Sequence, residues 1–335
     1  ASYLFLLIGV LFLIPAFWKF EAGTFMILGG SFCVLATLCY VFNVLNTGST
    51  NAHYKLSQYF LISSALWLLI TVTLGLCLAI NLRYPFISRN HLDIMKLHAH
   101  AGLVGWFLQL ITGVSVKLVP MFLVSRSDKI KTIYWAWVLQ NIGLLLFLVD
   151  NHLNPSNNRD WIYAIIVALG IFIWFRYLND VRKNRLRKSI DLPMKQTLIS
   201  FGFLLLALAA IPISLFQEDS KWTLLYGTLL ILGWITSIIL GQTFKTLPFI
   251  VWNEIYKNAP PSSAVPMPKL LFSEQLLRLQ WYLYLMAMGV LVIGIIISQT
   301  IIIQMAMLIW VLVALLYMVN VGKVLLHKFS KHEIH

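Results

Sequence analysis

Long apolar segments, separated by short polar ones, alternate along the whole chain. A segment of roughly 20 apolar residues is long enough to cross the hydrocarbon of a bilayer as a helix, and such segments recur throughout the sequence. We therefore expect an all-α fold, a polytopic transmembrane helical bundle of about ten helices. The expected helices cover residues 3–18, 22–47, 56–80, 97–122, 130–149, 160–178, 197–215, 222–250, 279–298 and 299–321.

Composition and charge favour the same setting. Hydrophobic residues make up 60% of the chain and charged residues only 11%, whereas soluble domains carry roughly 25% charged residues. The net charge is +13, and Lys and Arg gather in the loops after even-numbered helices, including the basic segment 176–188. By the positive-inside rule these loops and both ends of the chain face the cytoplasm, as expected for a multi-pass membrane protein. Anionic lipid is the expected partner of the basic segment, and nucleic acid is not.

Two apolar segments share a sequence pattern. GWFLQLITGVSVKLVPMF (105–122) aligns with GWITSIILGQTFKTLPFI (233–250) at a constant offset of 128 residues. An offset that spans four helices preserves the direction across the membrane, so the pattern predicts parallel four-helix repeats. We divide a single membrane domain, 1–335, into a half repeat (1–50), a first full repeat (51–190) and a second repeat (191–335). The half repeat suggests that two N-terminal helices are missing.

The main candidates for chemistry are His98 and His100, near the start of an apolar segment. Ionisable groups inside membranes are costly and tend to be functional. The matching positions of the second repeat hold Tyr226 and Thr228, so the repeat architecture does not require the histidines.

The two imidazoles are expected to face different neighbours, because residues i and i+2 lie about 200° apart on a helix. On the side of His98 the helix continues through Gly102, Gly105, Gln109 and Thr112. This predicts a shallow, partly polar groove with room for an open coordination position, and a flat cofactor could lie against this face or the opposite one. On the side of His100 the residues are apolar, and we expect a packed face. The lysines of the two matched segments, Lys117 and Lys245, are expected to extend toward lipid headgroups.

The histidine helix resembles a known motif. The pattern H-x-H-(S/A)-G-x-x-G-W, followed by a Gly and a Pro, is similar to the tenth helix of heme-copper oxidase subunit I. The resemblance is closest to the cbb3-type and nitric oxide reductase branch, and NnrS, a heme-containing membrane protein of the nitric oxide response, is similar too. It covers about 27 residues strongly, and the matching residues are His98, His100, Gly102, Gly105, Trp106, Gly113 and Pro120.

The resemblance implies a fold and a cofactor. Subunit I of this family has three four-helix arcs about a pseudo-threefold axis, which the 128-residue repeat also suggests. In the family the first histidine ligates a high-spin heme and the second a low-spin heme. The resemblance therefore implies heme b, with His98 and His100 as metal ligands and with Gly102 and Gly105 beside the cofactor.

The chain also departs from that family. It has no His-His pair, and the acidic residues fall in loops or at helix ends. A copper centre and an intramembrane carboxylate relay are therefore not expected, and the isolated chain is not expected to act as a terminal oxidase.

The resemblance therefore implies a b-type heme protein of the bacterial inner membrane, of the heme-copper oxidase subunit I type without the copper site, that serves electron transfer or binding of a diatomic gas (NO or O2). It could act within a respiratory or denitrification complex, with other membrane subunits or a cytochrome or quinol donor as partners. The alternative is a non-enzymatic structural, assembly or metal-transport subunit, in which the two imidazoles only link helices or pass on a metal ion.

Overall fold

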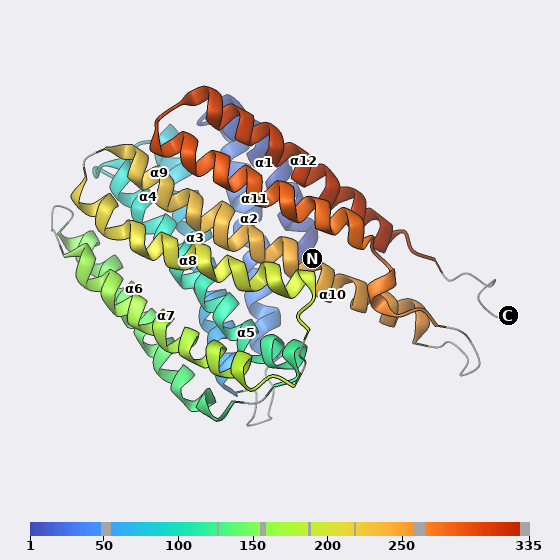
Figure 1. Cartoon of the computed structure of the whole chain (residues 1–335). Helices are drawn as coiled ribbons and strands as arrows, with labels where there is room; N and C mark the ends of the chain where they lie inside the picture. The colour runs from blue at the N-terminus through green and yellow to red at the C-terminus, as the bar shows by residue number, and fades with distance from the viewer. Residues whose placement is uncertain are drawn as a thin grey trace. The chain divides into compact units, whose positions relative to one another are not determined.

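The computed structural model describes residues 1–47, 55–125, 127–154, 159–186, 189–217, 219–257 and 265–328, which are predominantly helical and contain no strand. Ten helices in these residues are long and apolar enough to cross a membrane. The predicted all-α fold with about ten spans is confirmed (Figure 1). The chain is a multi-pass membrane protein, and its outer side chains contact lipid.

Contacts between helices divide the chain into two compact units, Ala1–Lys188 and Ser189–His335. In the first unit, α4, the π-helical segment η2 and α5 form one continuous span. The elements of the first unit are α1 (Ser2–Lys19), α2 (Thr24–Asn46), α3 (Lys55–Arg83), α4 (His91–His100), η2 (Ala101–Leu108), α5 (Gln109–Leu123), η3 (Asp128–Thr132), α6 (Ile133–Leu153) and α7 (Asp160–Lys183).

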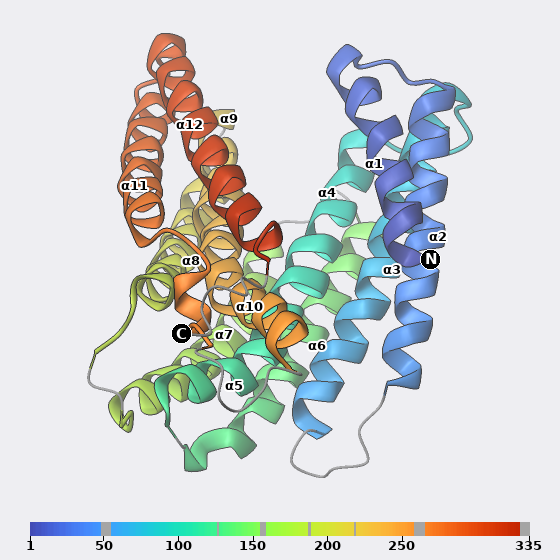
Figure 2. The same cartoon turned by 90° about the vertical axis from the view of Figure 1, so that its right-hand side faces the viewer.

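Within the first unit, each helix packs on its neighbour in the sequence. α1 pairs with α2, α2 lies against α3, α3 lies along the whole α4–η2–α5 span, and α6 pairs with α7. Figure 2 shows α1, α2 and α3 side by side in blue. Small residues form the seams, because helices in lipid associate through close packing. A Cβ added to Gly9 would lie 3.0 Å from the carbonyl oxygen of Gly29, and one added to Gly143 would lie 2.8 Å from Val167.

In the second unit, α8 packs along a second interrupted span, α9–η4–α10, and α11 pairs with α12. Its elements are α8 (Leu192–Phe216), α9 (Ser220–Thr228), the π-helical segment η4 (Leu229–Ile235), α10 (Thr236–Tyr256), η5 (Pro268–Leu270), α11 (Glu274–Ile296) and α12 (Thr300–Leu325).

Polar caps extend several helices beyond their apolar parts. The Asn90 side chain accepts a hydrogen bond from the Leu92 backbone N–H, and Asp219 accepts one from Lys221. These are typical helix-start contacts. α4 therefore begins at His91, six residues before the helix expected at 97, because apolarity marks only the part of a helix that lies in hydrocarbon. His98 consequently lies two turns inside its helix.

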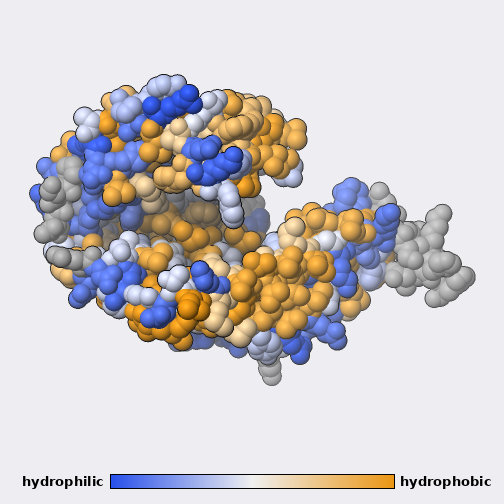
Figure 3. Space-filling model, turned by 90° about the horizontal axis from the view of Figure 1, so that it is seen from above, coloured by the Kyte–Doolittle hydropathy of each residue, from blue (hydrophilic) through white to orange (hydrophobic). Residues whose placement is uncertain are grey.

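The outer surface of the helices is largely apolar. Large hydrophobic side chains such as Leu11, Phe172, Leu206 and Leu308 are exposed, and hydrophobic residues form broad orange areas in Figure 3. On α12 only four residues are buried, and they lie on a narrow stripe: Ala306, Val313, Asn320 and Val324.

The two π-helical segments occupy matching places. η2 starts at Ala101 and η4 at Leu229, which is the same 128-residue offset that relates the two Gly-Trp segments. π-Helical turns are rare and often mark functional sites. Their recurrence shows that this backbone deformation accompanies the matched pattern, whether or not histidines precede it.

The helix before each π-containing span follows a different offset. A Cβ on Gly105 would lie 2.6 Å from Trp67, and one on Gly233 would lie 2.9 Å from Phe203. Trp67 and Phe203 are 136 residues apart. The same separation relates Phe60, which contacts Gly113, to Gln196, which contacts Gly241. The offset of 128 residues that relates the two π-containing spans therefore does not apply to α3 and α8, which are connected to the following span by segments of different length.

Candidate functional site

His98 lies against α3. Its Nδ1 atom is 2.9 Å from the backbone carbonyl oxygen of Thr71. A Cβ added to Gly75 would lie 2.9 Å from Cε1 of the imidazole, so the ring rests on the bare backbone of that glycine. The absence of a side chain at Gly75 is what allows the ring to approach α3 so closely.

His100 faces a different helix. Its Nδ1 atom is 2.8 Å from the carbonyl oxygen of Lys96, one turn earlier in α4. Its ring centroid lies 4.7 Å from that of Phe147 in α6. The two imidazoles therefore contact α3 and α6 respectively, as their angular separation on the helix predicts.

Both rings have the same hydrogen-bonding state. A carbonyl oxygen can only accept a hydrogen bond, so Nδ1 carries the proton in His98 and in His100. Each Nε2 then has a free lone pair, and neither has a hydrogen-bond partner in the described residues. Both side chains are half-buried. A neutral imidazole that donates from Nδ1 to a carbonyl and offers Nε2 is the usual form of a metal-ligating histidine.

The glycines near His98 form a seam with α3. A Cβ on Gly102 would lie 3.2 Å from the Thr71 methyl group, and a Cβ on Gly105 would lie 2.6 Å from the Trp67 ring. Gly102, Gly105, Gln109 and Thr112 are all buried. The prediction of a shallow groove on this face is wrong, because side chains of α3 fill the space beside Gly102 and Gly105. One helix considered alone cannot reveal which neighbour uses its glycines.

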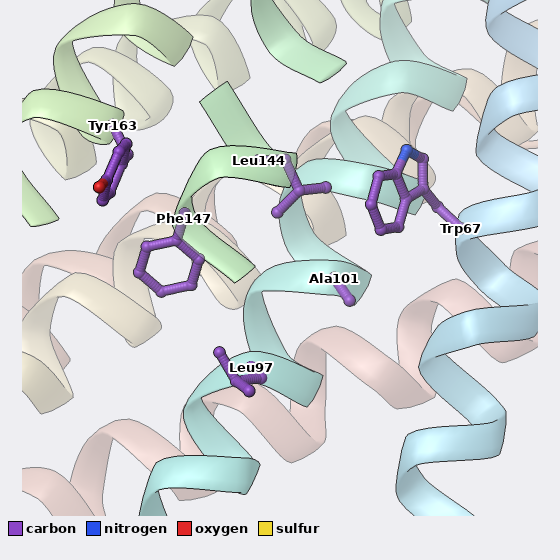
Figure 4. Close-up of a cluster of buried hydrophobic side chains, with 6 residues drawn as sticks. All are labelled: Trp67, Leu97, Ala101, Leu144, Phe147 and Tyr163. Atoms are coloured by element: carbon purple, nitrogen blue, oxygen red, sulfur yellow. The ribbon is translucent and has the colours of Figure 1, made fainter. Parts of the chain in front are cut away.

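The face that continues from His100 is less covered than expected. Val104, Phe107, Ile111 and Val114 are each half-buried, although a packed face was predicted there. Closer to His100, a buried cluster lies between α3, α4, α6 and α7, and Figure 4 shows its side chains. Its members are Trp67, Leu97, Ala101, Leu144, Phe147 and Tyr163. Packing density therefore does not support assigning the open side of the helix to His98 and the closed side to His100.

A charged cluster that the sequence analysis missed lies beside His100. Lys96 Nζ is 2.5 Å from Asp160 Oδ2 and 2.8 Å from Asn151 Oδ1. Asn151 in turn donates to Asp160 Oδ1 at 2.7 Å. In the sequence these three residues look like ordinary polar groups at the ends of three separate helices, and only the tertiary fold brings them together.

A polar network connects α3, α5 and α6 deeper in the span. Asn141 Oδ1 accepts from Trp67 Nε1 at 2.9 Å and from Gln109 Nε2 at 3.0 Å. The Ser63 hydroxyl donates to Gln109 Oε1 and accepts from Trp137 Nε1. These amides link helices, as expected for polar side chains within membranes.

Lys245 does not extend toward headgroups as predicted. Its Nζ atom lies 2.5 Å from Asp191 Oδ2, and the lysine side chain is only 13% exposed. Asp191 also caps α8 by accepting from the Met194 backbone N–H. Lys245 therefore ties α10 to the start of α8. The matching Lys117 has a contact of its own.

No group of three or more His, Cys, Asp or Glu side chains that could hold a metal ion occurs within the described parts of the chain. His53, His332 and His335 lie outside them. Comparison with known proteins finds no matching family model, no similar curated protein and no similar solved structure. The resemblance to heme-copper oxidase subunit I therefore rests on the histidine motif alone and stays a prediction.

Proposed function

We propose that this chain is a b-type heme protein of the membrane, with His98 and His100 as axial ligands. It would transfer electrons or bind a diatomic gas such as NO or O2. The observation that carries the proposal is the state of the two rings: each donates Nδ1–H to a backbone carbonyl and keeps Nε2 without a protein partner.

The residues present fit an iron porphyrin at the level of ligation. Heme iron is commonly held by histidine, and a second-shell hydrogen bond from the other ring nitrogen fixes the ring orientation and raises its basicity. Thr71 and Lys96 supply the carbonyls for that bond. When bound, heme would supply the redox or gas-binding chemistry, while this chain orients the ligands and sets their electrostatic surroundings.

The two rings would serve different macrocycles, because one contacts α3 and the other α6. A closed, six-coordinate heme needs a second axial ligand, and we propose that it comes from a partner subunit. We further propose a place in the bacterial inner membrane, within a respiratory or denitrification assembly that includes a cytochrome or quinol donor.

A second candidate function has its own support. The bond from His98 to the Thr71 carbonyl links α4 to α3, and a neutral imidazole with a carbonyl partner is tolerated in a membrane without any ligand. On this alternative the chain is a structural or assembly subunit, and the imidazoles only join helices.

A visible absorption spectrum of the purified protein, oxidised and then reduced with dithionite, separates the two candidates. The heme proposal predicts reducible b-type bands after expression in heme-replete cells or after addition of hemin. A protein that stays colourless under both conditions contradicts it and favours the structural alternative.

Replacement of single histidines tests the ligands. We expect His98→Ala and His100→Ala each to remove a different part of the heme spectrum or of the CO difference spectrum, because the rings face different helices. His152→Ala is the matched control, since His152 is an exposed histidine in the last turn of α6 and its replacement should leave the spectrum unchanged. If both variants keep the wild-type spectra, the imidazoles are packing groups.

A further inference from the structure

The Lys96 cluster described above is a closed triangle of hydrogen bonds from three helices. Lys96 belongs to α4, Asn151 to α6 and Asp160 to the first turn of α7. All three pairs of side chains are in contact, at 2.5 to 2.8 Å. The ammonium and carboxylate thereby neutralise each other at a half-buried site, where an unpaired charge would be costly.

Two routes connect this triangle to His100. The first is the Lys96 backbone, whose carbonyl oxygen receives the His100 Nδ1–H at 2.8 Å. The second is Phe147. The centroid of its ring lies 4.7 Å from the centroid of the His100 ring and 5.3 Å from Lys96 Nζ. Asn151 also donates to the Phe147 carbonyl at 3.1 Å. The triangle therefore holds both the carbonyl that orients the imidazole and the ring that packs against it.

We infer that Lys96, Asn151 and Asp160 are positioning residues for His100, and that the Lys96–Asp160 ion pair sets the electrostatic potential at the metal that His100 ligates. The inference rests on the proposed function and extends it. Anchoring Lys96 to α6 and α7 fixes the rotation of α4 about its axis, which aims Nε2 of His100. The paired charges lie one turn from the ligand, in surroundings where water screens them less than in bulk solvent.

The ion pair makes opposite predictions for its two members. Lys96→Gln removes a positive charge and leaves Asp160 unbalanced, so the His100-dependent heme should become harder to reduce and its midpoint potential should fall. Asp160→Asn does the reverse and should raise the potential. The double variant should lie between the single variants, because it removes both charges together.

Asn151→Ala tests positioning without a change of charge. It removes the bonds to Lys96 and to the Phe147 carbonyl, so we expect a broadened or shifted His100-dependent band. Lys96→Arg keeps the charge and should retain both the band and the potential. This rescue separates positioning from a general loss of folding, which size-exclusion chromatography and thermal unfolding monitor independently.

The matched control is the ion pair Lys129–Asp180, which also involves α7 but lies away from His100. Lys129 Nζ lies 2.9 Å from Asp180 Oδ1. The Lys129 and Asp180 side chains are 46% and 18% exposed, against 37% and 17% for Lys96 and Asp160. Lys129→Gln and Asp180→Asn should leave the potential at the wild-type value.

The experiment is a spectroelectrochemical titration of the purified, heme-loaded protein and of each variant. Opposite shifts for Lys96→Gln and Asp160→Asn, well beyond those of the control pair, support the inference. Shifts of equal size in both pairs, or none, overturn it while leaving the heme proposal in place. A wild-type protein that binds no heme overturns both.

Discussion

The spans His91–Leu123 and Ser220–Tyr256 share a backbone but differ in the side chains that could do chemistry. Both contain a π-helical segment at the same offset, and both set a glycine, Gly105 or Gly233, against an aromatic ring of the preceding helix. Only the first carries imidazoles. The comparison indicates that the π segment and the glycine seam belong to the architecture, whereas the histidines are a local addition.

A second difference lies on the preceding helix. By the 136-residue offset, the position of Gly75 corresponds to Ile211. Gly75 leaves room for the His98 ring, while isoleucine would fill that space. In the second unit, the π-segment carbonyl of Gly233 instead accepts a bond from the Tyr284 hydroxyl at 2.8 Å. The histidine site thus needs a cooperating glycine on a different helix.

The largest effect is expected when Gly75 is replaced by isoleucine, the residue at the matching position of the second unit. Gly75→Ile should displace the imidazole of His98 and remove the spectral feature that depends on it. Overpacking should also cost about 1–3 kcal/mol of stability. Gly202→Ala is the control, because nothing lies within 4 Å of the added Cβ. An unchanged His98-dependent spectrum in Gly75→Ile would show that the ring does not need this space.

Alanine at the two seam glycines tests whether the units are equivalent. Gly105→Ala and Gly233→Ala each place a Cβ too close to an aromatic ring, 2.6 Å from Trp67 and 2.9 Å from Phe203. We expect each variant to lose roughly 1–3 kcal/mol, seen as a lower thermal unfolding midpoint in detergent. If only one of the two variants unfolds at a lower temperature, the two glycines do not have the same packing role.

Replacing amides should separate the units by a smaller margin. Asn141→Leu leaves Trp67 Nε1 and Gln109 without their acceptor, which costs about 1–3 kcal/mol for buried groups. Gln242→Leu removes one bond, to the Thr197 hydroxyl, and bonds of this kind average roughly 0.6 kcal/mol in membranes. Thermal unfolding of the two variants should rank them in that order, and the reverse order would count against the network.

The smallest expected difference concerns the helix starts, where Asn90 is neutral and Asp219 is charged. Hydrogen bonds from the Lys221 backbone and side chain lower the pKa of Asp219 from its ordinary value of 3.8. Its stabilising contribution is therefore present above pH 3.8 and is lost as the pH falls through the lowered pKa. Asp219→Asn should abolish this loss of stability at acid pH. The thermal unfolding midpoints of the wild-type protein and the variant should therefore converge as the pH is lowered from about 6 to about 3. A constant difference would show that the charge contributes nothing.

The sequence was sufficient for the spans because apolar length alone decides whether a helix can cross a bilayer. It also predicted that His98 and His100 face different helices, since helical geometry fixes their angular separation. It could not predict that α3 fills the glycine seam, or that Lys245 pairs with Asp191. It also missed the triangle of Lys96, Asn151 and Asp160, because tertiary packing alone brings these residues together. The π segments carry no local signal that apolarity could reveal.

The recurrence of the π segment has an evolutionary consequence. The π segment occurs at the same offset in a span with histidines and in a span without them, so this backbone does not depend on the residues that distinguish the two spans. A lineage could therefore gain or lose the two imidazoles, together with a compensating exchange at Gly75, and still inherit the same helices. Relatives without histidines should be sought by the π-containing, glycine-seamed span, because a search by the histidine motif would overlook them.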